Sequence, residues 1–211
     1  MEIKILKSIL EANEEKADAI RRQLAATSLT MLNMIGSPGS GKTSILEKTL
    51  AALRTTLRIA IIEGDLATSK DAERLQPYDI PIIMINTEGG CHLDSPTIQK
   101  ALAELPTSAL DLIFIENVGN LVCPAEFDLG EHAKVAVLSV PEGDDKPSKY
   151  PYLFREAKAV ILNKIDLLPY TSFNREAFYA DLKQLNANIP VFEISCRTGE
   201  GMEGWIEWIR K

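Results

Sequence analysis

Short runs of Ile, Val, Leu and Met alternate along the chain with longer stretches in which apolar residues recur every three or four positions. The short runs lie at 31–35, 58–63, 80–86, 111–116, 135–140, 159–163 and 191–195. Continuous apolar runs of this length are typical of parallel strands that are buried on both faces. The stretches at 41–53, 69–75, 97–105, 175–185 and 202–210 have helical composition and spacing. The pattern therefore predicts an α/β fold, with a mostly parallel central sheet flanked by helices.

The N-terminal segment follows a different pattern, because its apolar residues share one helical face among many charged ones. These apolar residues are Leu6, Ile9, Leu10, Ala17, Ile20 and Leu24. The spacing predicts one amphipathic helix over 3–24 that packs against the body of the protein. We expect a helical extension at 1–28 and a single domain at 29–211.

Composition and charge narrow the classes of function. The 211 residues include 23 basic and 30 acidic ones, for a formal net charge of −7, and no Lys/Arg-rich run. A nucleic-acid partner is therefore not expected. No apolar stretch approaches the roughly 18 residues of a membrane span, and the N-terminus lacks the apolar segment of a secretory signal. We expect a cytoplasmic protein with no membrane partner, whose cysteines are reduced and available for metal.

A glycine-rich segment, Gly36-Ser37-Pro38-Gly39-Ser40-Gly41-Lys42-Thr43, joins the first strand to the next helix. It matches GxxxxGK[ST], the phosphate loop of P-loop NTPases, in which backbone N–H groups and a helix N-terminus surround phosphate oxygens. Lys42 is expected to reach the β and γ phosphates, and the Thr43 hydroxyl to ligate Mg²⁺. The expected nucleotide contacts here are Gly39, Ser40, Gly41, Lys42, Thr43 and Ser44.

Residues 163–166 read Asn-Lys-Ile-Asp and match the NKxD motif of guanine-nucleotide-binding proteins. Asp166 can accept hydrogen bonds from both N1–H and the amine of guanine, whereas adenine has an acceptor where guanine has N1–H. Asn163 would support the loop and purine N7, Lys164 would cover the ring, and the N–H of Cys196 would meet the base oxygen. The sequence thus predicts a GTP/GDP pocket made by Asn163, Lys164, Asp166, Ser195, Cys196 and Arg197.

Two carboxylates end strands at the expected carboxyl edge of the sheet, where ligands of α/β proteins bind. Glu116 begins Glu-Asn-Val-Gly, which departs from the usual DxxG, and is expected to hold Mg²⁺ while Gly119 senses the γ-phosphate. Asp65 is the candidate to orient or deprotonate the attacking water, or else to support the metal. The expected catalytic residues are Lys42, Asp65 and Glu116. Because no glutamine follows Gly119, we expect slow intrinsic hydrolysis that a partner or dimerisation accelerates.

A thiol and an imidazole, Cys91 and His92, are adjacent on a Gly-rich stretch, and Cys123 follows the Glu116 strand. Duplication by a two-fold axis could bring four thiolates together with His92 beside them. Such ligands suit Zn²⁺ or Ni²⁺. The alternative is two buried apolar cysteines and an exposed histidine. The other histidine, His132, is expected at the surface.

The motifs together resemble the HypB family of hydrogenase nickel-incorporation GTPases, in the metal-dependent dimeric branch of P-loop GTPases. The phosphate loop, EGD, GGCHLD, ENVGN with LVCP, EGDDKPxKYP, NKID and SCRTG occur in this order over 30–211. The resemblance implies GTP hydrolysis coupled to nickel delivery, a GTP-promoted homodimer, and Zn²⁺ or Ni²⁺ held by Cys91, His92 and Cys123 at its interface. It also implies a HypA-type nickel chaperone and the hydrogenase large subunit as partners, and it makes Lys146 and Lys149 candidate nucleotide contacts across subunits.

Residues 1–30 carry neither the N-terminal cysteine motif nor the histidine-rich tract of some family members, so nickel storage is not expected. The nearest alternative is a urease-type nickel-insertion GTPase, whose Cys-Pro-His motif differs from the adjacent Cys91 and His92. Two further alternatives are a P-loop kinase or ATPase, and a metal-buffering protein with a regulatory nucleotide site. Since Cys123 lies close in the chain to Glu116 and Gly119, we also expect loss of the γ-phosphate to loosen the metal ligands.

Overall fold

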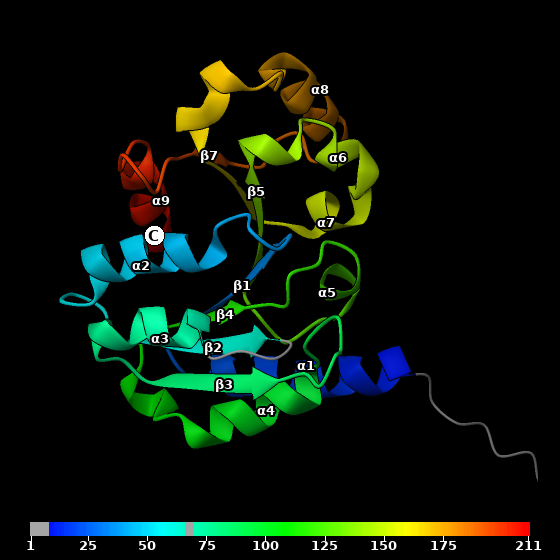
Figure 1. Cartoon of the computed structure of the whole chain (residues 1–211). Helices are drawn as coiled ribbons and strands as arrows, with labels where there is room; N and C mark the ends of the chain where they lie inside the picture. The colour runs from blue at the N-terminus through cyan, green and yellow to red at the C-terminus, as the bar shows by residue number, and fades with distance from the viewer. Residues whose placement is uncertain (1–8, 66–69) are drawn as a thin grey trace, which may run out of the picture.

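The computed structural model describes residues 9–65 and 70–211, with the backbone alone for 65 and 70–72. In this part of the chain, seven strands form one sheet in the order β3-β2-β4-β1-β5-β6-β7 (Figure 1). Every neighbouring pair is parallel, which confirms the predicted α/β architecture. The strands are β1 (Thr30–Gly36), β2 (Ile59–Asp65), β3 (Ile82–Asn86), β4 (Leu112–Glu116), β5 (Ala133–Ser139), β6 (Ala159–Asn163) and β7 (Val191–Glu193).

All seven strands were expected, and the ends of most of them differ from the prediction by one or two residues. β3 begins at Ile82 rather than at residue 80, because Pro81 has no N–H for the ladder. The carbonyl of Pro81 still accepts from the N–H of Ile61 at 3.0 Å. β7 ends at Glu193, two residues before the predicted end, where the chain turns towards the site.

Helices cover both faces of the sheet (Figure 1). Those on one face are α2 (Lys42–Leu53), α3 (Lys70–Leu75) and α9 (Met202–Ile209), which share one apolar cluster with the strands. Those on the other are α1 (Ile9–Ala25), α4 (Ser95–Glu104), α5 (Cys123–Glu126), α7 (Pro151–Glu156) and α8 (Arg175–Leu185). α6 (Lys146–Lys149) precedes α7, and 3-10 turns follow β5 (Val140–Glu142) and β6 (Ile165–Tyr170).

The N-terminal helix α1 lies against α4 in the described structure. It buries Ile20 and Leu24, whereas Leu6 of the predicted apolar face lies outside the described residues. Asn13 is buried in the same contact, donating to the carbonyl of Asp128 at 2.7 Å and accepting from the N–H of Ser95 at 2.8 Å. An extension held by buried apolar and polar contacts is part of the folded unit rather than a tail.

Three short helices, α5, α6 and α7, were not among the predicted ones. Each has a proline in its first turn, namely Pro124, Pro147 and Pro151, which is a helix-start signal that apolar periodicity does not register. α5 matters for the site because it begins at Cys123. Among the described residues, no helix has the length and apolarity needed to cross a membrane.

Candidate nucleotide and metal sites

The glycine-rich segment lies between β1 and α2, at the carboxyl edge of the sheet. A cavity of 390 Å³ opens over it and is lined by Pro38, Gly39, Gly41, Lys42, Thr43, Ser44, Glu63, Gly64, Arg74, Glu116, Asn117, Val118, Gly119 and Lys164. A neighbouring cavity of 490 Å³ shares Gly41, Ser44 and Lys164 with it. Two adjoining cavities with these polar linings suit an elongated ligand with phosphate at one end and a ring at the other.

The phosphate end gathers a lysine, a hydroxyl and two carboxylates. Thr43 Oγ1 donates to Glu116 Oε1 at 2.8 Å, which joins the phosphate loop to the end of β4. Lys42 Nζ donates to the carbonyl of Gly36 at 3.2 Å. Glu63 pairs with Glu116 in the register of β2 and β4, and both side chains are buried. A hydroxyl and carboxylates are the hard oxygen donors that suit Mg²⁺, so the residues present fit this ion.

Glu63 was not among the predicted site residues, although the strand pattern contains the signal for it. It precedes Asp65 by two positions, so both residues belong to the same face of β2. The side chain of Asp65, which was predicted to act on water or metal, lies outside the described residues. Glu63 is therefore the carboxylate of β2 that the described structure brings to Glu116.

Gly119 lies against the phosphate loop. A Cβ at this position would approach Pro38 Cγ to 2.7 Å, so only glycine allows the two segments to meet this closely. Gly119 and its neighbours Asn117 and Val118 line the phosphate cavity. The segment predicted to sense the γ-phosphate is thus in contact with the loop that would hold it.

The base end is built by the loops after β6 and β7. Asn163 donates to the carbonyl of Ser40 at 3.1 Å, and Lys164 Nζ donates to the carbonyl of Gly39 at 2.6 Å. A Cβ on Gly41 would lie 2.3 Å from Asn163 Nδ2, so this glycine lets the β6 loop reach the phosphate loop. The two predicted motifs are therefore in direct contact.

Asp166 is oriented by a neighbouring hydroxyl, because Ser195 Oγ donates to Asp166 Oδ1 at 2.6 Å. Asp166, Cys196 and Arg197 line the base cavity, while Ser195 is buried behind it. The N–H of Cys196, which was predicted to meet the base, donates to Asn163 Oδ1 at 3.4 Å in this structure. Burial raises the pKa of Cys196 to about 11, so its thiol stays protonated at neutral pH.

Sequence reasoning missed Arg74 on α3. It forms an ion pair with Glu47 at 2.6 Å and donates to Ser44 Oγ at 3.0 Å, so it ties α3 to the first turns of α2. By contrast, Lys146 and Lys149 line neither cavity of their own chain. Lys149 Nζ lies 2.6 Å from an Asp145 carboxylate oxygen, and contact across subunits stays a prediction.

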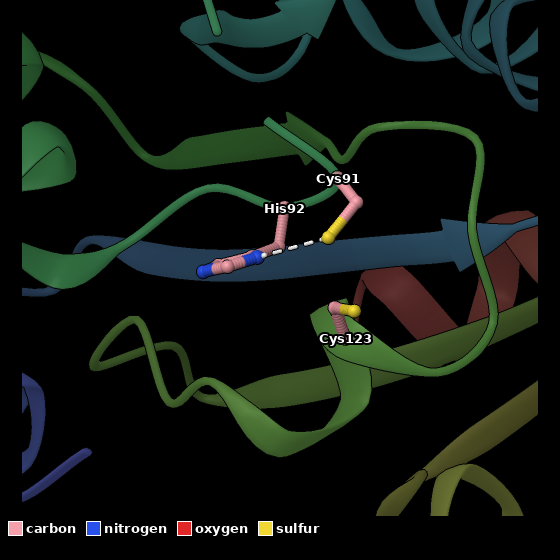
Figure 2. Close-up of side chains that lie close together, drawn as sticks. All are labelled: Cys91, His92 and Cys123. Carbon is pink, nitrogen blue, oxygen red and sulfur yellow. Dashed lines mark hydrogen bonds between the residues drawn. The ribbon is translucent and has the colours of Figure 1, made fainter. Parts of the chain in front are cut away.

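Cys91 and His92 follow β3, and Cys123 follows β4. The three residues come together although β2 lies between these two strands in the sheet. Figure 2 shows Cys91 and His92 on one loop, facing Cys123 at the start of a short helix. Their ligand atoms all lie within 4.8 Å of one another, and Cys91 Sγ is 3.5 Å from His92 Nδ1. Cys91 is exposed, so the alternative interpretation of two buried apolar cysteines is wrong.

Local contacts position the side chains of this cluster and shift the pKa values of two of them. The His92 ring packs against Phe127, with ring centroids 3.7 Å apart and ring planes tilted by 32°. Burial lowers the pKa of His92, which favours the neutral imidazole that binds metal. A hydrogen bond with Cys123 raises the pKa of Cys91, because the bond favours the neutral thiol, and the charge of a neighbouring thiolate acts in the same direction. Two thiols and one imidazole fit Zn²⁺ or Ni²⁺ and leave a tetrahedral site one ligand short. His132 is exposed, as predicted.

Comparisons with known proteins point in one direction. The model of the CobW/HypB/UreG nucleotide-binding domain matches residues 29–193. The hydrogenase maturation factor HypB of Escherichia coli (strain K12) is 48% identical over 201 residues, covering 95% of this chain and 69% of that protein. The crystal structure of HypB from Helicobacter pylori in complex with nickel has a TM-score of 0.88 and 36% identity, covering 94% of both chains. HypB from Archaeoglobus fulgidus also has a TM-score of 0.88, with 37% identity over 94% of this chain and 97% of that one.

Proposed function

The chain belongs to the HypB family of CobW/HypB/UreG nucleotide-binding domains, and on this premise we propose that it is a GTP-hydrolysing metallochaperone delivering nickel during [NiFe] hydrogenase maturation. The single observation that carries the proposal is that one segment, 117–123, runs from the phosphate cavity to the thiol cluster. Asn117, Val118 and Gly119 line the phosphate cavity, and the segment ends at Cys123, where α5 begins.

The nucleotide pocket supports GTP as the substrate. Asp166 is the base-reading carboxylate, Lys42 neutralises the β and γ phosphates, and Gly119 offers its N–H to the γ-phosphate. Thr43 and Glu116 would hold Mg²⁺, with Glu63 beside them. The ion would supply charge neutralisation to the phosphates. Asp65 is the proposed residue for orienting or deprotonating the attacking water. The remaining proposed nucleotide contacts are Gly39, Ser40, Gly41, Ser44, Asn163, Lys164, Ser195, Cys196 and Arg197.

The cargo site supports nickel transfer and a homodimer. Cys91, His92 and Cys123 leave a tetrahedral site one ligand short, so a second copy would complete it at a shared interface. GTP binding would favour this dimer, and hydrolysis would release the cargo. Its partners would be a HypA-type nickel chaperone and the hydrogenase large subunit in the cytoplasm.

A complementation experiment tests this function. Cells that lack their own copy of this maturation factor receive the wild-type protein, Lys42→Ala or Cys123→Ser, and nickel in the hydrogenase is measured. We expect nickel incorporation with the wild type and loss with either variant. Asp181→Asn on α8 is the matched control, since it changes one charge outside both sites.

Parallel binding measurements separate this function from its alternatives. Lys42→Ala should lose GTP turnover yet keep nickel binding by the monomer, and the wild type should bind GTP much more tightly than ATP. Full hydrogenase maturation by Lys42→Ala would instead favour metal buffering and overturn the proposal.

A further inference from the structure

One asparagine side chain joins the backbone of Cys91 to that of Val122, the residue before Cys123. Asn120 Nδ2 donates to the carbonyl of Cys91 at 3.2 Å. Its Oδ1 accepts from the N–H of Val122 at 3.0 Å, one residue before Cys123. The amide of Asn120 therefore spans from one thiol-bearing segment to the other. It touches neither sulfur, so any effect on the ligands is one of position.

Asn120 directly follows Gly119, which contacts the phosphate loop. Gly119 lines the phosphate cavity and lies close enough to Pro38 that a Cβ would clash. The planar peptide unit that carries the N–H of Gly119 ends at the Cα of Gly119, to which the peptide unit of Asn120 is joined, so a ligand that displaces this Cα also displaces the start of the Asn120 peptide unit. Asn120 thus directly follows a residue that lines the phosphate cavity, and its side chain contacts the backbone of Cys91 at the cargo site.

Asn117 makes a second connection of the same kind. Its Oδ1 accepts from the N–H of Leu93 at 3.3 Å and from the N–H of Val118 at 3.0 Å. Leu93 directly follows His92 in the chain, and Val118 lines the phosphate cavity. Asn117 Nδ2 donates to Asn33 Oδ1 at 3.1 Å in β1, and both side chains are buried. These hydrogen bonds hold the backbone at Leu93, next to His92, in a fixed position relative to β1.

We propose that Asn120 is the positioning residue through which the nucleotide state sets the separation of the Cys91 and Cys123 thiolates. Asn117, which is hydrogen-bonded to β1, keeps the backbone at Leu93 in place. The proposal rests on the proposed function and deepens it. Movement of the 118–119 segment would displace Asn120 while Asn117 holds Leu93. The thiol spacing would then change without displacement of the sheet.

The test measures Ni²⁺ affinity in two nucleotide states. Wild type, Asn120→Ala and Asn120→Asp are titrated with Ni²⁺ in GDP and in a nonhydrolysable GTP analogue, and the thiolate-to-nickel absorption band is recorded. Asn120→Asp keeps the acceptor for Val122, removes the donor to Cys91 and adds a negative charge, so Asn120→Ala is the uncharged comparison for it. Asn186→Ala is the control, because Asn186 donates to the carbonyls of Phe154 and Ala157 and lines neither nucleotide cavity.

We expect both Asn120 variants to lose about tenfold or more of the Ni²⁺ affinity in the nucleotide state that binds Ni²⁺ more tightly, as is usual when a group supporting a metal ligand is removed. The ratio of the Ni²⁺ affinities in the two nucleotide states should therefore approach one. The absorption band should stop responding to the nucleotide, while Asn186→Ala keeps the wild-type ratio and band. A merely structural role would weaken both states equally, and an unchanged ratio would therefore overturn the proposal. If wild type binds Ni²⁺ with equal affinity in both states, nucleotide coupling and this proposal fail together. If it binds no Ni²⁺, the proposed function itself fails.

Discussion

At the scale of single residues, the proposed selectivity for guanine rests on one carboxylate held by one hydroxyl. Asp166 lines the base cavity and accepts from Ser195 Oγ at 2.6 Å. An ionised carboxylate offers acceptors only, and the guanine edge offers two donors to it. Held in place before the ligand arrives, this group loses little conformational freedom on binding.

Replacing Asp166 with Asn tests this interpretation. The amide has one acceptor and one donor group, so guanine would meet a donor opposite its amine. We expect GDP affinity to fall at least about 100-fold, from the cost of mismatched buried donors. Xanthosine diphosphate, which has a carbonyl in place of that amine, should bind the variant better than GDP does. Calorimetric titration of both nucleotides measures this exchange.

The matched control is Asp181→Asn, which makes the same chemical change on α8. It should leave GDP affinity within about twofold of wild type, because Asp181 lines neither nucleotide cavity. Equal GDP affinity in Asp166→Asn and wild type would show that the carboxylate does not read the base.

Residue chemistry could be predicted where the motif is local and not where it depends on distant segments. The phosphate loop and the 163–166 motif are each recognised from the spacing of residues within one short segment, so their residues could be predicted from the sequence. Phe127, which packs against His92, is 35 positions away by residue number and carries no spacing signal. Arg74 was missed for the same reason, because its partners Glu47 and Ser44 lie on another helix.

At the scale of elements, α9 keeps α2 against the sheet through one fully buried indole. Trp205 is buried and its Nε1 donates to Thr49 Oγ1 at 2.9 Å. Trp205→Phe leaves a cavity and removes this donor, so we expect a loss of about 2 kcal/mol in the free energy of unfolding. Chemical denaturation measures it. Trp208→Phe, the same change in a partly buried ring, should cost under about 1 kcal/mol, and equal losses in both variants would contradict the argument.

An ion pair joins the N-terminal ends of β2 and β4. Asp111 Oδ1 lies 2.6 Å from Arg58 Nη2, and its Oδ2 accepts from the Arg58 N–H at 2.8 Å. These bonds lower the pKa of Asp111 to about 2. A carboxyl with a lowered pKa stabilises the fold above its unfolded pKa of about 4, and this contribution is lost as the pH falls towards 2.

The Asp111→Asn variant isolates this charge. We expect it to be less stable than wild type at pH 7, by a small amount because the pair is at the surface. The difference should shrink between about pH 4 and about pH 2, where the wild-type carboxylate takes up its proton. Urea denaturation at several pH values measures both curves. A difference independent of pH would mean that the shape of the side chain matters and its charge does not.

The elements themselves were largely predictable, since a parallel sheet covered on both faces leaves long apolar runs in the sequence. What could not be predicted was the order β3-β2-β4-β1-β5-β6-β7, because apolar periodicity contains no pairing information. The short helix α5 was missed as well, although it begins at Cys123 and brings this thiol to the Cys91 loop. Its four residues are too few to show a helical period.

At the scale of the whole molecule, charge and ligand number act in opposite directions on self-association. Each chain has a net charge of −7, so two copies repel each other at a distance. The cluster of Cys91, His92 and Cys123 has three ligand groups, and a tetrahedral ion needs a fourth. A metal shared by two copies would supply attraction where the surfaces meet, and salt would lessen the repulsion.

Dimerisation should therefore depend on the metal and on Cys123. With a nonhydrolysable GTP analogue and Zn²⁺ or Ni²⁺, the wild type should double its mass from 23.3 kDa in analytical ultracentrifugation. Cys123→Ser should stay a monomer, because a hydroxyl is a poor ligand for these ions beside thiolate. Its affinity for GDP should match the wild type, since Cys123 lines neither nucleotide cavity. A chelator added to the wild type should reproduce the variant. If Cys123→Ser dimerised as the wild type does, the metal would not bridge the two copies, and the interface would have to form from other contacts.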